Sequence, residues 1–431
     1  MRRGSNRRNY NLPMEWFSHL RQADPQVYNA IALETRRQHE KLELIASENF
    51  VDYSVLEALG QPMQNKYAEG YPGRRYYGGC EHVDTVENLA RDRAKRLFGC
   101  EHANVQPHSG TQANIAALMA LAAPRDRVLS MSLDHGGHLS HGHAKNFTGL
   151  FYEVHSYGVE KGSERLDMDR VRAIAREVRP KVIIAGASAY SRTLDFQAFA
   201  SIAREVGAKL LVDMAHVAGL VAAKVHPSPV GHADVVTLTT HKTLRGPRGG
   251  MILAGADWIK QLNSTVFPGG QGGPLMHVIA AKAVALREAL DPAFTAYQRR
   301  VVDNARILAA ALAQRGLRIV SGGTDNHLML VDVTPKSLSG RQAEDLLHAV
   351  DITCNKNLIP YDQQPPTKAS GIRLGTAAIT TRGLGRAEVL KLAGVIADVL
   401  RAPGDEGVQR RARGTVRELT EAFPIRAGQP A

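Results

Sequence analysis

Long apolar runs and cysteines are scarce in this chain of 431 residues. No stretch approaches the roughly 18 consecutive apolar residues that a membrane-spanning helix needs. The three cysteines, Cys80, Cys100 and Cys354, are too scattered for a disulfide framework or a zinc site, which would show paired CxxC spacing. Internal repeats and low-complexity segments are also missing. We therefore expect a protein of the reducing cytoplasm, with no membrane span and no bound metal.

Charge is the one unusual feature of the composition, with a formal net charge of +12. The first residues, Met1 to Pro13, carry four arginines and no acid, and they lack the apolar segment of a signal peptide. We expect a disordered basic arm there rather than an address signal. Elsewhere the basic residues are spread out and form no stripe, so nucleic acid is an unexpected partner. The excess indicates a solvated surface, or attraction of anionic small molecules.

The length favours two domains, because single cores stop growing at about 250 to 300 residues. Asp24 and Pro25 are good residues to begin a helix, and apolar residues recur at helical spacing from there to about Leu44. Polar or helical stretches, including 167–178 and 195–206, then separate short apolar runs. Such alternation predicts an α/β fold with a mainly parallel sheet between two layers of helices. The runs lie at 127–132, 151–155, 181–186, 209–213, 234–239 and 250–254.

The last third of the chain predicts a smaller α/β domain. Two long helices, 274–290 and 294–315, are separated at Asp291-Pro292, where a proline ends one helix and can start the next. Strands at 328–333 and 371–375 and helices at 340–349, 385–400 and 408–422 follow. We expect an N-terminal arm and helix at 1–50, a large domain at 51–291 and a small C-terminal domain at 292–431.

Asp213 and Lys242 are the most informative pair of residues. Each follows one of two successive predicted strands, LLVD and VVTLT, and ligands of open parallel sheets lie beyond the carboxyl ends of strands. A lysine in such a crevice can condense with an aldehyde once desolvation lowers its pKa. An acid one ring-length away would keep a pyridine nitrogen protonated. Together they predict a pyridoxal phosphate site, although either residue alone would suit a surface lysine or a helix cap.

A phosphate would need backbone amides at the start of a helix. Ser109, Gly110 and Thr111 supply hydroxyls and a glycine just before the apolar run AALMALA, without the lysine of a nucleotide-binding loop. A plain helix cap would explain this segment equally well if it stood alone. The glycine-rich run at 267–274 also precedes a helix, and its amides could complete the phosphate site of its own subunit or of a second one.

Four histidines, His135, His138, His141 and His143, lie within nine residues. A metal site is disfavoured, since glycines place them in a turn and no carboxylate or cysteine completes a ligand set. A ring that stacks on a planar cofactor needs only one histidine, and we choose His138.

Arg373 lies inside an apolar run, where an unpaired guanidinium is costly. Capture of a substrate carboxylate would resolve that cost, and a structural ion pair is the alternative. The loop from Tyr67 to Gly79 combines aromatics, an acid and glycines, a mixture that favours the wall of a site over packing alone.

These segments resemble serine hydroxymethyltransferase, and the likeness runs from about Leu42 to Leu400. Several long motifs carry it: LIASENF, NKYAEGYPGRRYYGG, NVQPHSGTQAN, DHGGHLSHG, LVDMAHVAGLVAA, TTHKTLRGPRGG, VFPGGQGGPL and SGIRLGT. The resemblance implies the α/β fold of pyridoxal-phosphate enzymes of fold type I, which is like that of aspartate aminotransferase. It also implies reversible transfer of a hydroxymethyl group between serine and tetrahydrofolate, in a homodimer or a tetramer with shared active sites.

The resemblance also implies roles for individual residues. Lys242 would carry the cofactor, Asp213 would pair with its ring nitrogen, His138 would stack on the ring and His216 would approach the phenolic oxygen. The phosphate would lie against Ser109, Gly110, Thr111, His241 and, from the neighbouring subunit, Gly273. Arg373 and Ser47 would bind the substrate carboxylate. Glu69, Tyr67 and Tyr77 would line the reacting end across the dimer interface. Thr239 and Arg248 would support the lysine side and the tyrosine cluster. Folate would lie against Leu133, Gly137, Leu139 and Asn357.

The chain departs from the family pattern at two places. Pro365-Pro366-Thr367 stands where many relatives carry a serine-proline-phenylalanine stretch, and Ala377 stands where a proline is common. Folate affinity and the preferred amino acid stay open, because one methyl group is worth only about 1 to 3 kcal/mol of discrimination. The alternatives are a 2-methylserine hydroxymethyltransferase, a folate-independent aldolase of β-hydroxy amino acids, and, from another class, a nucleic-acid-binding protein or an inactive regulator.

Overall fold

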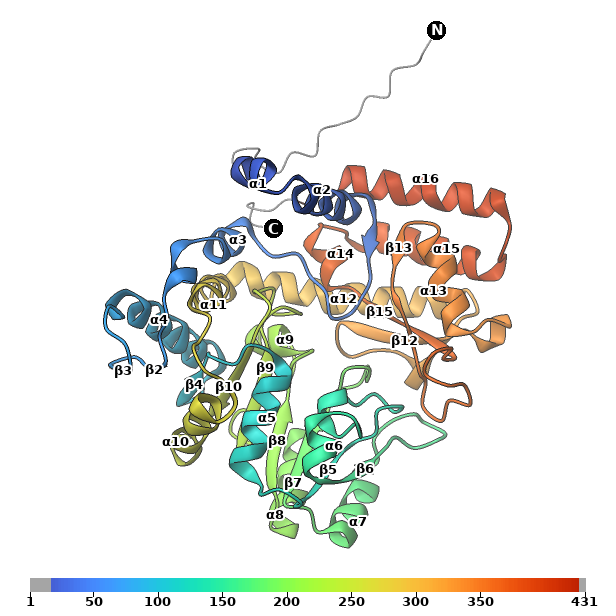
Figure 1. Ribbon diagram of the computed structural model, residues 1–431. Coiled ribbons are helices and arrows are strands. Elements are labelled where there is room, and N and C mark those ends of the chain that lie inside the picture. Colours follow the sequence, from blue (N-terminus) through green and yellow to red (C-terminus); the bar gives the residue numbers. More distant parts are fainter. Residues whose placement is uncertain (1–16, 426–431) are drawn as a thin grey trace.

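The computed structural model describes residues 17–425, so the predicted basic arm at 1–13 lies outside the described residues. The chain builds a seven-stranded sheet at its centre and a four-stranded sheet nearer its C-terminal end (Figure 1). Within the described range, no helix is both long and apolar enough to cross a membrane.

The seven-stranded sheet is mixed but mostly parallel, as predicted. Strands β5 to β9 pair in parallel, and β10 runs antiparallel to both β9 and β4. All six predicted strands are present, although β6 begins two residues later than predicted, because Phe147–Phe151 form the short helix α6. In spatial order the strands are β4 (His102–Asn104), β10 (Gly250–Ala254), β9 (Val235–Thr239), β8 (Lys209–Asp213), β7 (Val182–Gly186), β5 (Arg127–Met131) and β6 (Glu153–Tyr157).

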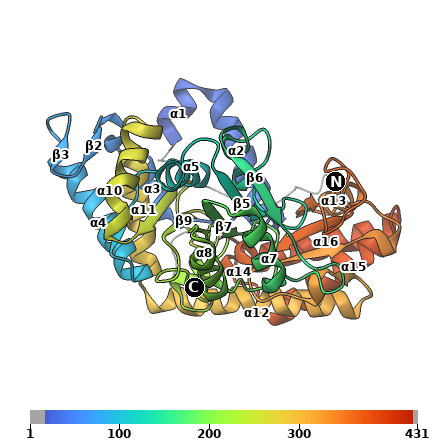
Figure 2. The same ribbon diagram turned by 90° about the horizontal axis from the view of Figure 1, so that it is seen from below.

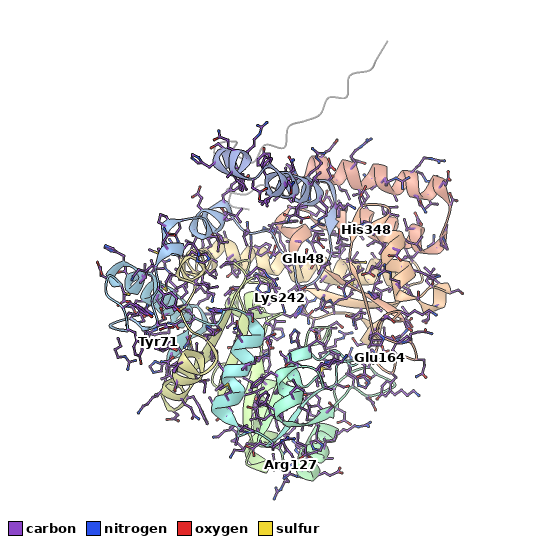
Figure 3. The ribbon with its side chains drawn as sticks, viewed as in Figure 1. Glu48, Tyr71, Arg127, Glu164, Lys242 and His348 are labelled. Carbon is purple, nitrogen blue, oxygen red and sulfur yellow. The ribbon has the colours of Figure 1, made fainter. Side chains whose placement is uncertain are left out.

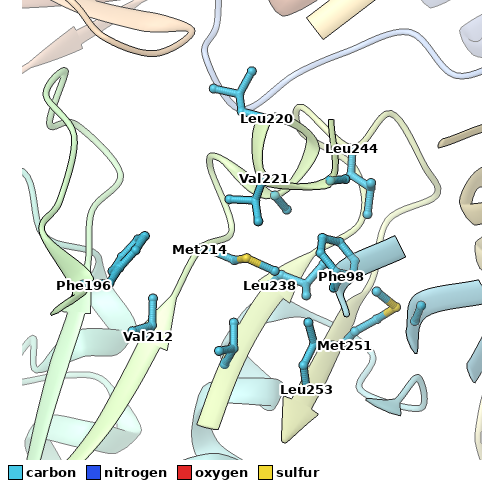
Figure 4. Packing of buried hydrophobic residues seen from close by; sticks show 14 of the residues in the cluster. Phe98, Phe196, Val212, Met214, Leu220, Val221, Leu238, Leu244, Met251 and Leu253 are labelled. Atoms are coloured by element: carbon cyan, nitrogen blue, oxygen red, sulfur yellow. The ribbon is translucent and has the colours of Figure 1, made fainter. Parts of the chain in front are cut away.

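Helices cover both faces of this sheet, which explains why its strands are almost continuously apolar. Ile183 and Leu210 point into one hydrophobic cluster, while their neighbours Ile184 and Leu211 point into another on the opposite face. The first cluster is filled by α4, α7, α8, α9 and α11, and the second by α5 and α10. Figure 4 shows part of the first cluster. The helices are α4 (Glu81–Phe98), α5 (Gly110–Leu121), α7 (Met168–Val178), α8 (Phe196–Val206), α9 (Ala218–Ala222), α10 (Ala256–Ser264) and α11 (Met276–Ala289).

A long helix, α12 (Pro292–Gln314), joins the two parts of the molecule (Figures 1 and 2). Asp291 caps it, as the Asp-Pro pair predicts. Val301 and Val302 on α12 pack into the core of the large sheet, whereas Ala305 and Leu308 pack into a separate core around the small one. The helix therefore links the two cores rigidly.

The small sheet has the order β11-β12-β15-β14 and is antiparallel throughout. The five predicted elements, β12, β15, α13, α15 and α16, agree with the structure to within two residues, whereas β11, β14 and α14 were not predicted. The elements of this part of the chain are β11 (Arg318–Ile319), β12 (Leu328–Asp332), β14 (Asn355–Asn357), β15 (Gly371–Gly375), α13 (Gly340–His348), α14 (Ala377–Thr381), α15 (Arg386–Arg401) and α16 (Glu406–Ala422).

The N-terminal helix ends earlier than predicted. After α1 (Ser18–Ala23), Asp24 caps α2 (Pro25–Glu40) as expected, but β1 (Leu42–Glu43) follows and pairs with β13 (Ile352–Thr353). The prediction of a helix to Leu44 is therefore wrong. An extended backbone lets Leu42 and Leu44 both enter the core of the small sheet, where neither side chain is exposed. The chain then passes through α3 (Tyr53–Leu59) to the two-stranded ribbon β2 (Gly70–Tyr71) and β3 (Arg74–Arg75).

The packing of α8 yields a stability prediction. Phe199 is fully buried, with its ring centroid 5.5 Å from that of Tyr157. Phe199→Ala is expected to lower the free energy of unfolding by about 3–5 kcal/mol, because the surrounding core cannot close the cavity. Leu150→Ala is the control, since that side chain is 63% exposed and should change stability by less than about 0.5 kcal/mol. Urea unfolding followed by circular dichroism measures both, and equal losses would contradict this packing.

Candidate active site

Lys242 and Asp213 meet in a buried crevice at the carboxyl edge of the large sheet. Asp213 ends β8, and Lys242 lies three residues beyond the end of the neighbouring strand β9. Figure 3 shows Lys242 in the middle of the molecule, between the large sheet and the C-terminal part. Burial lowers the pKa of Lys242 to about 8; the charge of Asp213 opposes this shift, and those of Arg373 and Arg248 add to it. About a tenth of this amine is therefore uncharged at pH 7, far more than for an ordinary lysine.

Asp213 is held as an anion despite its burial. Desolvation alone would raise the pKa of this carboxyl, but hydrogen bonds from the side chains of His141 (2.9 Å) and Asn114 (2.8 Å) hold it well below its usual range. The amide of Ala215 donates to the other carboxylate oxygen at 2.9 Å. His141 accepts the amide N–H of His138 at its Nδ1, so its Nε2 carries the proton for Asp213. A fixed buried carboxylate of this kind suits a cationic ring nitrogen.

Asn114 and His141 were not among the predicted site residues. Asn114 is oriented in turn by Thr237, whose hydroxyl donates to the amide oxygen at 2.6 Å. His141 belongs to the histidine cluster, and Asn114 closes the segment assigned to the phosphate, so both stood in motifs already recognised. The signal that could have found them is the need of a buried carboxylate for donors.

The histidine cluster divides into separate roles. Burial lowers the pKa of His138 to about 4, so its imidazole is neutral and free to stack on a planar group. Its Nδ1 lies 2.7 Å from Ser140 Oγ and accepts the amide of Ser140. His135 instead accepts the amide of Val159 and packs against Tyr361. Residues 17–425 contain no group of three or more histidine, cysteine or acidic side chains placed to hold a metal.

The start of α5 faces the same crevice. Ser109 caps the helix by accepting the amide of Gln112. Within residues 17–425 the amides of Gly110 and Thr111, in the first turn, have no hydrogen-bond acceptor. Gly110 lies so close to Thr239 that a Cβ atom would be 2.6 Å from its methyl group. His241 lies nearby, and burial lowers the pKa of its imidazole to about 3. These groups can bind a phosphate through neutral donors.

Arg373 enters the crevice from β15 of the small sheet. Its guanidinium donates to Ser188 O (2.7 Å) and Asn355 Oδ1 (3.3 Å), and burial lowers its pKa to about 10. Across residues 17–425 it forms no ion pair with a carboxylate, which argues against the structural alternative. Ser47 follows Ala46, whose backbone packs against Gly375 at the end of the same strand. A carboxylate ligand would therefore find an unpaired cation here.

His216 packs against a second buried histidine that the sequence did not single out. The rings of His216 and His327 stack with centroids 5.4 Å apart, and their nitrogens lie 3.3 Å from each other. Burial lowers the pKa of both, so both are neutral at physiological pH. His327 is anchored in turn by the carbonyl of Ala46 at 3.2 Å.

Tyr67, Glu69 and Tyr77 form a cluster of their own at the surface. Both tyrosine hydroxyls donate to Glu69, at 3.2 and 3.4 Å, and their rings meet edge to face. Tyr67 is 52% exposed, and its ring lies against Gly273, where a Cβ atom would be 2.9 Å away. Tyr71 of the same segment lies far from Lys242 in Figure 3. The structure thus gathers the residues assigned to the neighbouring subunit, and among residues 17–425 none of these three side chains forms a hydrogen bond to Lys242.

The predicted folate contacts come from two places. Leu133 and Leu139 are half exposed in the segment after β5, and Gly137 lies between them, where a Cβ atom would be 2.2 Å from Met131 O. Asn357 ends β14, and its side chain donates to Leu358 O. Arg248, which was predicted to support the tyrosine cluster rather than to contact folate, follows Lys242 in the chain and is exposed.

Comparisons with known proteins identify the family. A family model described as serine hydroxymethyltransferase matches residues 20–396. A protein of Acidobacterium capsulatum named serine hydroxymethyltransferase is 59% identical over 406 residues, which cover 94% of this chain and 95% of that protein. The chain belongs to the serine hydroxymethyltransferase family. Enzymes of this family use pyridoxal phosphate, with tetrahydrofolate as co-substrate, so the predicted family, enzyme class and cofactors are confirmed.

The residues present fit pyridoxal phosphate. A buried amine of lowered pKa suits its aldehyde, an anion held by three donors suits its ring nitrogen, and the first turn of α5 suits its phosphate. Gly110 and Gly137 have no space for a Cβ atom, because the methyl group of Thr239 lies against the first and the backbone of Met131 lies against the second.

The lowered pKa of Lys242 predicts how cofactor binding depends on pH. Only the unprotonated amine attacks an aldehyde. With a pKa of about 8, the rate at which the cofactor-free enzyme binds pyridoxal phosphate should rise with pH and level off above about pH 8. Stopped-flow absorbance measures this rate. A free lysine analogue in the same solutions corrects for titration of the cofactor itself, and a rate that still climbs as steeply beyond pH 9 (about the behaviour of an ordinary lysine) would contradict the assignment.

Proposed function

We propose that the enzyme transfers a hydroxymethyl group reversibly between serine and tetrahydrofolate, with Lys242 as the residue that carries the cofactor. The single observation that supports this most strongly is the buried pair of an amine with a lowered pKa and a fixed carboxylate on neighbouring strands. The family comparison favours this reaction over the aldolase, the 2-methylserine enzyme and the nucleic-acid-binding protein.

Three side chains would orient the ring of the cofactor, and a separate group of residues would hold its phosphate. The cofactor supplies a conjugated, protonated ring that accepts the electron pair left when the Cα–Cβ bond of serine breaks. Asp213 keeps the proton on the ring nitrogen, since the donors around it keep the carboxylate charged. His138 stacks on the ring and His216 approaches the phenolic oxygen, both as neutral imidazoles. Ser109, Gly110, Thr111 and His241 hold the phosphate, together with Gly273 of the neighbouring subunit.

Arg373 and Ser47 would bind the amino-acid carboxylate. A guanidinium with no carboxylate partner in the described chain gains a charge-assisted contact when substrate binds. Its place on the small sheet, opposite Lys242 on the large one, sets the distance between the substrate carboxylate and its amino group. Thr239, whose hydroxyl donates to Ala215 O, supports the lysine side of the crevice.

The tyrosine cluster would complete the site of the partner subunit. Glu69 takes and returns the proton on the hydroxymethyl oxygen or on the folate, and Tyr67 and Tyr77 orient it by the hydrogen bonds that they already donate. Arg248 supports the tyrosines from the other chain. Folate lies against Leu133, Gly137, Leu139 and Asn357, where it captures the one-carbon unit.

This arrangement requires at least a homodimer, and we include that assembly, or a tetramer, in the proposal.

We also propose fold type I, with an N-terminal segment at 1–50, a large domain at 51–291 and a small domain at 292–431. The two hydrophobic cores on either side of the middle of α12 support a division near this helix. A cytoplasmic location completes the proposal.

Cleavage of serine with and without tetrahydrofolate tests the reaction. We expect rapid formation of glycine only when tetrahydrofolate is present, because the folate captures the one-carbon unit as it is released. Threonine and 2-methylserine, assayed in parallel, separate the two related enzymes. Equal rates with and without folate would overturn the transferase assignment in favour of the aldolase, and a faster reaction of 2-methylserine would reassign the substrate.

Mixed dimers test the shared site. Lys242→Ala and Glu69→Gln each remove one side of it, so each variant alone should be inactive. Random mixing after subunit exchange gives about half heterodimers with one intact site each, and should restore about a quarter of wild-type turnover. Mixing Lys242→Ala with Asp213→Ala, whose positions lie in the same chain's crevice, is the matched control and should restore nothing. The assignment of Glu69 to the partner would be contradicted if the mixture of Lys242→Ala with Glu69→Gln recovered no turnover, whatever the control mixture does.

A further inference from the structure

Lys282 on α11 is a buried cation that the proposed reaction does not use. Only 1% of its surface is exposed, although it carries a charged group on a long side chain. Its Nζ donates to three backbone carbonyls, of Val105 (2.7 Å), Pro107 (3.0 Å) and Gly250 (2.9 Å). An ammonium has three protons, so all of its donors are used.

The three carbonyls belong to the backbone that carries the phosphate-binding residues. Val105 and Pro107 form the extended segment that leads into Ser109. Gly250 begins β10 and presses against the Ser109–Gly110 peptide, where a Cβ atom would lie 2.3 Å from Ser109 O. The amide of Gly250 also donates to Pro107 O at 3.0 Å. Lys282 therefore joins both strands of backbone that fix the first turn of α5.

The opposite side of the same segment is fixed by Gln271. Its side chain donates to Gln106 O at 3.1 Å and accepts the amide of His108 at 3.0 Å. The carbonyls of residues 105 to 107 thus alternate between Lys282 on one side and Gln271 on the other, so the segment has little freedom to shift.

Glycine at position 249 makes room for the ammonium. A Cβ atom there would lie 2.5 Å from Lys282 Cε and 3.0 Å from its Nζ. The amide of Gly249 donates to the ring of His241 at 3.4 Å, beside the residue that carries the cofactor. Burial lowers the pKa of Lys282 to about 7, and the charge of Glu87 opposes the shift. Neutralising the amine would remove one of its three donated hydrogen bonds in a buried place, which favours the charged form.

We infer that Lys282 is a positioning residue for the cofactor phosphate: its ammonium binds the carbonyls of Val105, Pro107 and Gly250 and thereby holds the amides of Gly110 and Thr111 in the geometry that a phosphate needs. The inference rests on the proposed function, and it concerns the phosphate alone. Binding of the pyridine ring and of the aldehyde depends on Asp213, His138 and Lys242, which Lys282 does not touch.

The test compares two forms of vitamin B6 that differ only in the phosphate. Absorbance titrations of the cofactor-free enzyme give the dissociation constants of pyridoxal phosphate and of pyridoxal. Lys282→Met keeps the length of the side chain but removes the charge and the donors. We expect it to weaken pyridoxal phosphate binding at least about tenfold, the equivalent of one hydrogen bond to a charged group, and to change pyridoxal binding less than about twofold.

Arg382→Met is the matched control, because Arg382 is also a buried cation bound to backbone carbonyls. It donates to those of Gln38, His39, Lys41, Thr420 and Phe423, at the N- and C-terminal helices and away from the crevice. Its loss should lower stability without changing the ratio of the two dissociation constants.

Unchanged pyridoxal phosphate binding in Lys282→Met would overturn the inference, and so would an equal loss for both compounds, which indicates general damage. If this variant does not fold, Gly249→Ala, which pushes the ammonium aside without removing it, must give the same selective loss, and an unselective result overturns the inference. Wild-type enzyme that binds no pyridoxal phosphate at all would instead refute the proposed function.

Discussion

The site depends on keeping a buried acid ionised beside a buried amine that gives up its proton easily. Burial works against charge on both Lys242 and Asp213, so by itself it would leave each of them neutral. Asp213 stays ionised because His141, Asn114 and the amide of Ala215 all donate hydrogen bonds to its carboxylate. For Lys242 Nζ there is no hydrogen-bond acceptor among residues 17–425, so burial lowers its pKa. Hydrogen bonds, rather than depth, explain why Asp213 is held firmly as an anion while the pKa of Lys242 falls.

That arrangement explains why the small sheet is needed. The large sheet supplies the acid, the amine and the phosphate turn, but no cation for a carboxylate. Arg373 comes from β15 and reaches across to Ser188 O of the large part, and α12 packs into both cores and fixes the distance between them. The neutral pair His216–His327 lies on the same boundary, with His327 anchored to Ala46 O. Additional positive charge at this boundary would compete with the cofactor for Asp213, which is why neutral imidazoles suit it.

Much of this could be predicted from the sequence where the signal was local. Strands β8 and β9 are buried on both faces, so they read as short continuous apolar runs, and the residues at their ends follow directly. β4 has only three residues and left no such run. Phe151 and Tyr152 looked like the start of a strand, but they belong to the end of α6 and the turn after it. The donors of Asp213 could not be found in this way, since Asn114 and His141 lie 99 and 72 residues from it along the chain.

Two buried lysines in this chain show how little residue type alone determines. Lys242 and Lys282 are both almost completely covered, and burial lowers the pKa of both. Lys282 meets three carbonyl oxygens, one for each proton, so its charge is used to hold backbone together. Lys242 meets none in the described chain, and two arginines lie near enough to disfavour its charge further. The first environment commits all the protons of a lysine to backbone carbonyls, and the second leaves the amine available to react. Lys282 binds the backbone that precedes Ser109, and Lys242 follows β9 of the same sheet. The inert lysine therefore sets the position at which the phosphate must lie when the reactive one meets the aldehyde.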